Sequence, residues 1–140
     1  MLKQILFGGE SGLSFIGNAG IALLRIFAGV SLSLAHGWGK LPVKQQFIDN
    51  VANLGFPAPA FFAWAAALSE FAGGAFLALG LFTRISGFFI VILMLVAVFG
   101  VHINDPYGKQ ELAMFYLFTG LCFMLKGAGD WSLDAYLRRR

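Results

Sequence analysis

Three ionisable side chains share one face of a long apolar stretch near the start of the chain. In residues 19–40 (AGIALLRIFAGVSLSLAHGWGK), the steps from Arg25 through Gly29 and Ser33 to His36 and Lys40 are always three or four residues. At about 3.6 residues per turn, such steps place all five on the same helix face. A charge in the middle of a bilayer costs at least about 2.5 kcal/mol, so ionisable residues there face protein or a water-filled cavity. These three side chains are therefore candidates for function.

A single carboxylate, Glu70, lies in a second apolar stretch among small residues. Alanine and glycine dominate its face at helical spacing, which includes Ala63, Ala66, Ala67, Gly73, Gly74 and Leu77. Small residues let helices approach closely, and consecutive elements are usually neighbours, so we expect Glu70 to be buried against the polar face of 19–40. At about 1.5 Å per residue its depth lies between those of Arg25 and His36, which leaves both as candidate partners. An arginine side chain on this helix leans toward the helix N-terminus and so away from Glu70, which makes His36 a serious alternative partner for Glu70.

Three further polar side chains, His102, Glu111 and Tyr116, reach a similar depth when counted in the same way. Such a cluster suits proton-coupled redox chemistry, because reducing a quinone adds protons as well as electrons. In this interpretation His36 and Lys40 donate hydrogen bonds to a carbonyl oxygen, while Glu70 or Glu111 relays a proton. We therefore predict three catalytic residues, Glu70, His36 and Lys40, and four binding residues, Arg25, Glu111, His102 and Tyr116. No metal site and no covalently bound cofactor is predicted.

Two other interpretations remain open at the level of sequence. Arg25, His36 and Glu70 could form a buried polar network that fixes helix register, although Ser or Thr would do so at a lower desolvation cost. His36 and His102 could be axial ligands of haem because their depths match, but two histidines without a further signature leave haem disfavoured. Cys122 is the only cysteine, which excludes dithiol chemistry and a cysteine-ligated cluster within one chain.

The composition indicates a membrane protein. Of the 140 residues, 59% are hydrophobic and only 12% are charged, whereas soluble domains have about 25% charged residues. Four apolar segments, about 19–39, 60–82, 85–102 and 111–125, can be compared with a hydrocarbon core about 30 Å thick. The last is short and needs Lys126 to reach toward the interface. We predict an all-α fold over residues 1–140, a single domain built as a bundle of four transmembrane helices.

The segment between the first two spans has its own pattern. Phe47, Val51 and Leu54 recur at helical spacing, and Gly55 with Pro57 ends the pattern. This predicts a short amphipathic helix on the outer surface, which could also cover the end of the bundle.

The basic residues indicate topology. With four spans, six of them lie on the side of the termini and three on the other side: Lys3, Arg84, Lys126, Arg138, Arg139 and Arg140 against Lys40, Lys44 and Lys109. By the positive-inside rule, both termini are predicted to be cytoplasmic. The formal net charge of +3 forms no soluble basic patch, so no nucleic-acid partner is predicted. Contact with the lipid bilayer accounts for the C-terminal arginines, and Asp130 is expected to cap a brief helix before them.

Several of these positions together resemble a known family. The pattern Leu24-Arg25, Gly29, His36-Gly37 and Lys40, followed by Glu70, Gly73-Gly74, Leu79-Gly80-Leu81 and Thr83-Arg84, is similar to that of the DoxX family of small four-helix membrane proteins. The resemblance covers roughly residues 23–129. It carries over to Arg25, His36, Gly37, Lys40, Glu70, Gly73 and Gly74.

Relatives called DoxD are a subunit of thiosulfate:quinone oxidoreductase, and other members are associated with membrane complexes that handle thiols and superoxide. The resemblance therefore implies an inner-membrane subunit that supports electron transfer from small sulfur or thiol compounds to quinone. A redox partner protein and self-association into a homo-oligomer are both compatible with such a small bundle. The alternative is a non-catalytic membrane anchor or assembly partner for soluble redox enzymes. A transporter of small solutes is disfavoured, because no inverted repeat of broken helices is visible.

Overall fold

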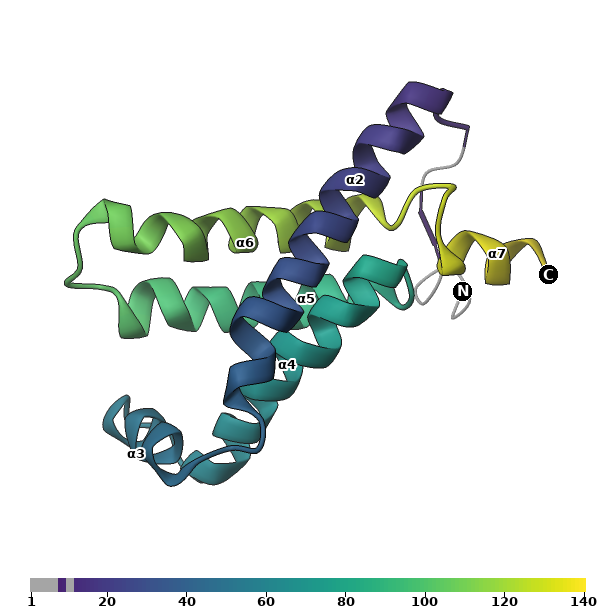
Figure 1. The fold of residues 1–140 in the computed structure, drawn as a ribbon. Helices are drawn as coiled ribbons and strands as arrows, with labels where there is room; N and C mark the ends of the chain where they lie inside the picture. The colour runs from purple at the N-terminus through teal and green to yellow at the C-terminus, as the bar shows by residue number, and fades with distance from the viewer. Residues whose placement is uncertain (1–7, 10–11) are drawn as a thin grey trace.

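The computed structural model describes residues 8–9 and 12–140, and every regular element in this part of the chain is a helix. The order is α2 (Phe15–Ser31), the π-helical turn η1 (Leu32–Gly37), the 3₁₀ turn η2 (Trp38–Lys40), α3 (Gln45–Asn53), α4 (Pro59–Leu79), α5 (Thr83–Val96), the π-helical turn η3 (Ala97–Val101), α6 (Tyr107–Lys126) and α7 (Leu133–Arg139) (Figure 1). The predicted all-α class is confirmed. Lys3, used above for topology, lies outside the described residues.

Three helices are long and apolar enough to cross a membrane. They are the continuous rod Phe15–Lys40, α4, and α5 extended by η3 as Thr83–Val101. These three helices correspond to the first three predicted spans. The fourth candidate, α6, has 20 residues, or about 30 Å of helix, but carries Lys109 and Glu111 in its first two turns. The count of four spans therefore stays a prediction.

Local sequence explains where the helices begin and end. The hydroxyl of Ser14 accepts a hydrogen bond from the Gly17 N–H at 3.1 Å, so α2 begins four residues before the predicted limit of 19. Pro59 opens α4, where a missing N–H costs nothing. Gly80 ends α4 earlier than the predicted limit of 82, because it adopts the left-handed conformation (φ 66°). A Cβ there would also lie 2.2 Å from Arg25 Nη1, so only glycine fits.

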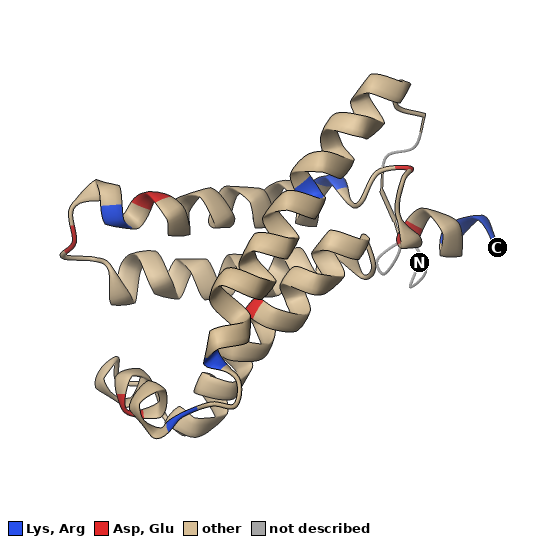
Figure 2. Cartoon of the chain, viewed as in Figure 1, with Lys and Arg blue, Asp and Glu red and all other residues tan. Residues whose placement is uncertain are grey.

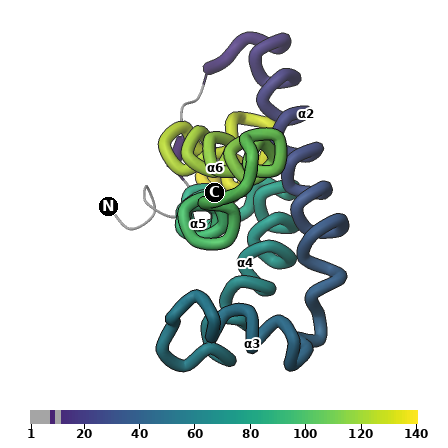
Figure 3. Tube along the Cα trace, turned by 90° about the vertical axis from the view of Figure 1, so that its left-hand side faces the viewer, coloured from purple at the N-terminus to yellow at the C-terminus, as the bar shows by residue number. Residues whose placement is uncertain are grey.

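The helices form two antiparallel pairs that cross at a large inclination. The rod of α2 and η1 packs along α4, and α5 packs along α6. Figure 3 shows α5 and α6 nearly end-on while α2 and α4 run across the view. Glycines bring the first pair close, since a Cβ at Gly29 would lie 2.5 Å from the backbone of Gly74 and of Ala78. This confirms the predicted close approach of small residues, with Gly74 at the contact.

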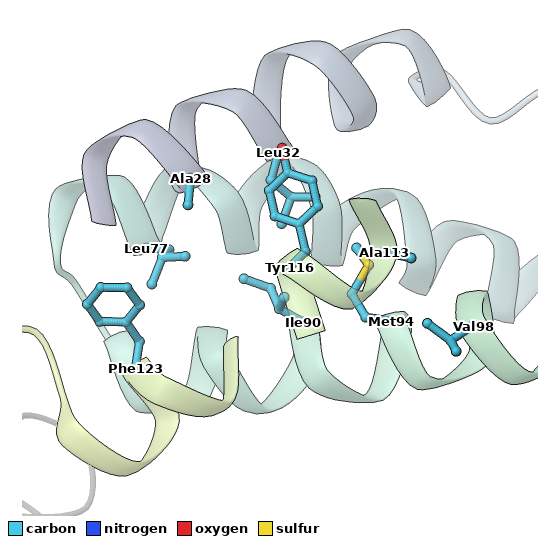
Figure 4. Close-up of a cluster of buried hydrophobic side chains, with 9 residues drawn as sticks. All are labelled: Ala28, Leu32, Leu77, Ile90, Met94, Val98, Ala113, Tyr116 and Phe123. Atoms are coloured by element: carbon cyan, nitrogen blue, oxygen red, sulfur yellow. The ribbon is translucent and has the colours of Figure 1, made fainter. Parts of the chain in front are cut away.

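The core runs along the junction of the two pairs. Nine buried side chains from all four long helices meet there: Ala28, Leu32, Leu77, Ile90, Met94, Val98, Ala113, Tyr116 and Phe123 (Figure 4). Tyr116 is the one polar member, and it carries the core toward the candidate site described below.

The C-terminal segment lies at one end of the bundle together with Gly9 and Gly12, and there α7 docks against the α4–α5 turn. Both oxygens of Asp134 accept backbone N–H groups at the start of α5, from Phe82 at 2.8 Å and Thr83 at 2.9 Å. The capping prediction for Asp130 is wrong, because α7 begins at Leu133 and the Ser132 hydroxyl occupies the capping position. Asp130 instead accepts the Gly12 N–H at 3.1 Å and so ties the N-terminal segment to the C-terminal one.

Candidate functional site

A buried ion pair joins the first rod to α4. Lys40 Nζ lies 2.5 Å from Glu70 Oε1, and the Glu70 side chain is only 7% exposed while that of Lys40 is 34% exposed. Glu70 is the single charge within α4, and Figure 2 shows an acidic position in the middle of that helix, whereas most other charged positions lie toward the ends of the elements. Arg25, within α2, is the other charge in the interior of a long helix. Glu70 is thus buried against the first rod, in the position predicted.

Neither of the expected partners, Arg25 or His36, pairs with Glu70. The lean of a helical side chain toward its own N-terminus explains the difference, because it directs Lys40 from the end of the rod back toward the bundle interior. The same lean carries Arg25 away from Glu70. The π-helical turn η1 and the 3₁₀ turn η2 also change the phase of the rod just before Lys40, so an ideal helix count misplaces this residue.

The ion pair borders a cavity of about 280 Å³ at the end of the bundle opposite the chain termini. Every long helix contributes to its walls, which are mostly apolar: Ala66, Leu93, Met94, Val96, Ala97, Val101, Leu112 and Ala113. The polar lining comes from His36, Lys40, Glu70, His102, Lys109 and Tyr116. Five of the seven predicted site residues therefore meet at one cavity.

The amphipathic helix α3 covers this cavity. It confirms the helix predicted from the spacing of Phe47, Val51 and Leu54, and all three side chains line the cavity. The Lys40 ammonium lies 5.4 Å from the centroid of the Phe47 ring, a cation–π distance that links the cover to the ion pair. Phe47 thus helps to shield the Lys40–Glu70 pair.

Two aromatic rings stand beside the ion pair. His36 on η1 and Tyr116 on α6 meet edge to face, with ring centroids 5.7 Å apart. Tyr116 is buried, as expected for a residue deeper in the bundle. Together they supply an imidazole and a phenol to the wall of the cavity.

His102 lies at the outer rim of the cavity, where the chain turns from η3 into α6. Its Nδ1 is 2.7 Å from Asp105 Oδ2, and the Gln110 side chain donates to the backbone oxygens of His102 (2.8 Å) and Asp105 (2.9 Å). The hydrogen bond between the His102 ring and the Asp105 carboxylate holds the pKa of Asp105 below its ordinary value. Partial burial opposes this effect, and the charge of Lys109 adds to it. His102 therefore stands between the cavity and the exposed turn.

Arg25 lies far from the cavity, at the end of the bundle that holds the chain termini. Its Nη1 donates to the backbone oxygens of Leu77 (3.0 Å) and Ala78 (2.9 Å), and its Nη2 donates to that of Trp131 (2.8 Å). Arg25 is only 2% exposed and adds hydrogen bonds to the carbonyl groups at the C-terminal end of α4, where the Leu77 oxygen also accepts the Gly80 N–H. The structure therefore places Arg25 outside the predicted cluster of site residues.

Glu111 is also outside the cavity, because it points from the opposite face of α6. It lines a separate groove with Leu24 of α2 and with Cys122, which is exposed there. Depth alone placed Glu111 in the cluster, but the helix phase set by the start of α6 turns it away. The structure therefore places Glu111, like Arg25, outside the predicted cluster of site residues.

Lys109 also lines the cavity, although it was not among the predicted site residues. It lines the cavity from the first turn of α6, and its ammonium lies 3.8 Å from Asp105. The available signal was its spacing of three, four and seven residues from Leu112, Ala113 and Tyr116, which places all four on one helix face.

The cavity joins hydrogen-bond donors to one unsatisfied acceptor. Within the described part of the chain, Glu70 Oε2 is buried and has no hydrogen-bond partner. Lys40 has three N–H donors and uses one on Glu70. The arrangement can therefore hold a small ring or chain in apolar surroundings while donating to, and accepting from, its polar atoms.

Fold and site together define a polytopic helical membrane protein with an ion-paired cavity near one end of its bundle. The DoxX family model matches residues 20–103, and the chain belongs to the DoxX family. It is 29% identical over 119 residues to "Putative oxidoreductase CatD" of Bacillus subtilis (strain 168), a match that covers 84% of this chain and 87% of that protein. No solved structure matches. The family match includes His36, Lys40, Glu70 and His102.

Proposed function

We propose that this DoxX protein is a membrane subunit that supports electron transfer from small sulfur or thiol compounds to quinone, with the quinone ring bound in the cavity beside Lys40 and Glu70. The observation that supports this most is the buried ion pair at the edge of an apolar cavity. Burying a carboxylate is costly and is rarely needed for packing alone. The relative whose name describes an oxidoreductase is consistent with this class of chemistry.

The residues of the cavity suit the steps of quinone reduction. A quinone takes up two electrons and two protons to become a quinol, while two thiols release two electrons and two protons as they form one disulfide. Lys40 would donate a hydrogen bond to one quinone carbonyl oxygen and favour the negative charge that develops there. Glu70, next to Lys40, would relay protons, and His102 at the rim would exchange them with the aqueous side.

The volume of the cavity limits the ligand. At about 280 Å³ it lies just below the range of small-molecule pockets, which is roughly 300–1,000 Å³. One substituted ring fits this space, with any isoprenoid tail leaving between helices toward lipid. A haem macrocycle is too large for it, and the His102 Nδ1 is already bonded to Asp105. Haem therefore stays disfavoured in this proposal.

We further propose an inner-membrane location with four spans, α6 being the fourth, and with both termini in the cytoplasm. The geometry is compatible with this, since Arg138 Nη1 donates to the Gly9 oxygen at 3.0 Å and the two ends share one side. The positive-inside rule then assigns that side, with its arginines, to the cytoplasm. The cavity would face the outer half of the bilayer.

The non-catalytic anchor remains the rival function. It would place the important residues at the Arg84 turn and the C-terminal tail. The bonds of Arg84 to the Leu125 oxygen and of Arg138 to Gly9 are made within the chain, which favours a structural role for these arginines over a docking role.

The test is quinone reduction by the purified protein in nanodiscs, with thiosulfate and simple thiols as donors. We expect Glu70→Gln to lower the turnover rate by about 100-fold or more, the scale of a lost acid–base group. Glu111→Gln is the matched control, because it removes the same charge outside the cavity and should leave the rate near that of the wild type. Failure of the wild type to reduce quinone with any donor would overturn the proposal and favour the anchor.

A further inference from the structure

The carboxylate of Glu70 is an acceptor that the protein leaves half used. One oxygen accepts from Lys40, and the other has no hydrogen-bond partner within the described chain. A carboxylate offers about four lone-pair sites, and its terminal torsion is soft, so a small rotation can present either oxygen to a neighbour. Because Glu70 lines the cavity, a ligand there is the neighbour that can supply the missing donor.

The two redox forms of a quinone differ in whether they can donate a hydrogen bond to Glu70. A quinone carries only acceptors at its ring oxygens, and Lys40 or a ring N–H of His36 can serve them. A quinol carries two O–H groups and can in addition donate to Glu70. A hydrogen bond to a buried charged group is among the stronger ones in proteins, and leaving such a group unsatisfied carries its full desolvation cost.

We infer that the cavity binds the quinol form more tightly than the quinone form, through donation of a quinol hydroxyl to Glu70. The inference rests on the proposed function, since it takes the quinone couple as the ligand. It adds which redox form the site selects and which residue makes the selection.

This preference has a consequence for the bound couple. Tighter binding of the reduced form makes reduction of the bound quinone more favourable, and each tenfold preference raises its two-electron potential by about 30 mV. The site would thereby make quinone a better oxidant for thiols. It would also make quinol release a slow step.

The experiment compares three ring probes of matched substitution under anaerobic conditions. They are a methylbenzoquinone, the corresponding hydroquinone, and its dimethyl ether, which keeps the ring and the oxygens but has no O–H. Binding to the protein in nanodiscs is measured by equilibrium dialysis, without any electron donor. We expect the hydroquinone to bind roughly tenfold more tightly than either of the other probes, the scale of one hydrogen bond to a charged group.

Two variants locate the selection. In Glu70→Gln the new amide can donate as well as accept, so the preference for hydroquinone should fall to about twofold or less. In Glu111→Gln the tenfold preference should remain. The comparison of probes on the wild type keeps the test valid even where Glu70→Gln folds poorly.

The outcomes separate this inference from the proposed function. Quinone binding as tightly as hydroquinone, a preference unchanged by Glu70→Gln, or binding of none of the probes would overturn the inference. Turnover of quinone without the binding preference would leave the proposed function standing alone. The preference without any turnover would support the selective site and count against electron transfer by this chain.

Discussion

Replacing Lys40 with methionine should destabilise the protein more than replacing Glu70 with glutamine, although both changes break the same ion pair. The structure makes the two partners unequal, because the Glu70 side chain is 7% exposed and that of Lys40 is 34% exposed. In Lys40→Met a carboxylate stays buried with neither oxygen paired. In Glu70→Gln the partly exposed Lys40 ammonium can reach more polar surroundings, and the oxygen of the new glutamine can still accept a hydrogen bond from it.

The expected magnitudes follow from these exposures. Breaking a buried ion pair by removing one partner costs about 3–5 kcal/mol, and an exposed pair contributes at most about 1 kcal/mol. We expect about 3 kcal/mol for Lys40→Met, because Glu70 remains buried, and about 1 kcal/mol for Glu70→Gln. The double variant should also lie near 1 kcal/mol, since it leaves no unpaired charge, so the two single effects are strongly non-additive.

The free energies of unfolding can be compared by titrating the protein in mixed micelles with a denaturing detergent and following helix content by circular dichroism. Wild type, both single variants and the double variant complete the cycle. Equal losses in the two single variants, or a double variant whose loss is the sum of both, would refute the argument from unequal burial.

Three further predictions test the contacts that hold the helices and the terminal segments in place. Gly29→Ala should lower the free energy of unfolding by about 1–3 kcal/mol, because its Cβ would meet the α4 backbone at 2.5 Å, whereas Gly20→Ala on the same helix meets nothing within 4 Å and should be near neutral. Asp134→Ala should cost about 2–3 kcal/mol by thermal unfolding, since one buried and one partly buried N–H group at the start of α5 lose their acceptor. Burial raises the pKa of Asp130, but hydrogen bonds outweigh it and leave the pKa below its ordinary value. Its contribution is therefore present above about pH 4 and lost as pH falls below that, so the protection of the Gly12 amide against hydrogen exchange, relative to its intrinsic rate, should fall only in acid and should not respond to acid in Asp130→Asn.

The fold was largely predictable because its main signals are local. Apolar length gave three spans, the spacing of Phe47, Val51 and Leu54 gave α3, and small residues gave the close contact at Gly74. The helix limits were less predictable. Gly80 ends α4 early in a left-handed conformation, and its place beside the Arg25 guanidinium is a contact between distant parts of the sequence.

Most residues of the site could be predicted from the sequence, but the ion-pair partner of Glu70 could not. Depth along an ideal helix placed Glu70, His36 and His102 in the middle and outer parts of the bundle, and the structure places all of them at one cavity. Depth carries no information about helix phase, and so Glu111 was included although it faces away. The partner of Glu70 depended on how η1 and η2 redirect the rod before Lys40, and no short motif reports a π-helical turn.

The most direct test of the central claim, that the Lys40–Glu70 cavity binds quinone, is photolabelling of the protein in nanodiscs with an azidoquinone, followed by peptide mass spectrometry. We predict labels on α3 and on the first half of α6, displaced by excess quinone, strongly reduced in Glu70→Gln and retained in Glu111→Gln. Labels confined to the groove that contains Glu111, or labelling that excess quinone does not displace, would contradict the account.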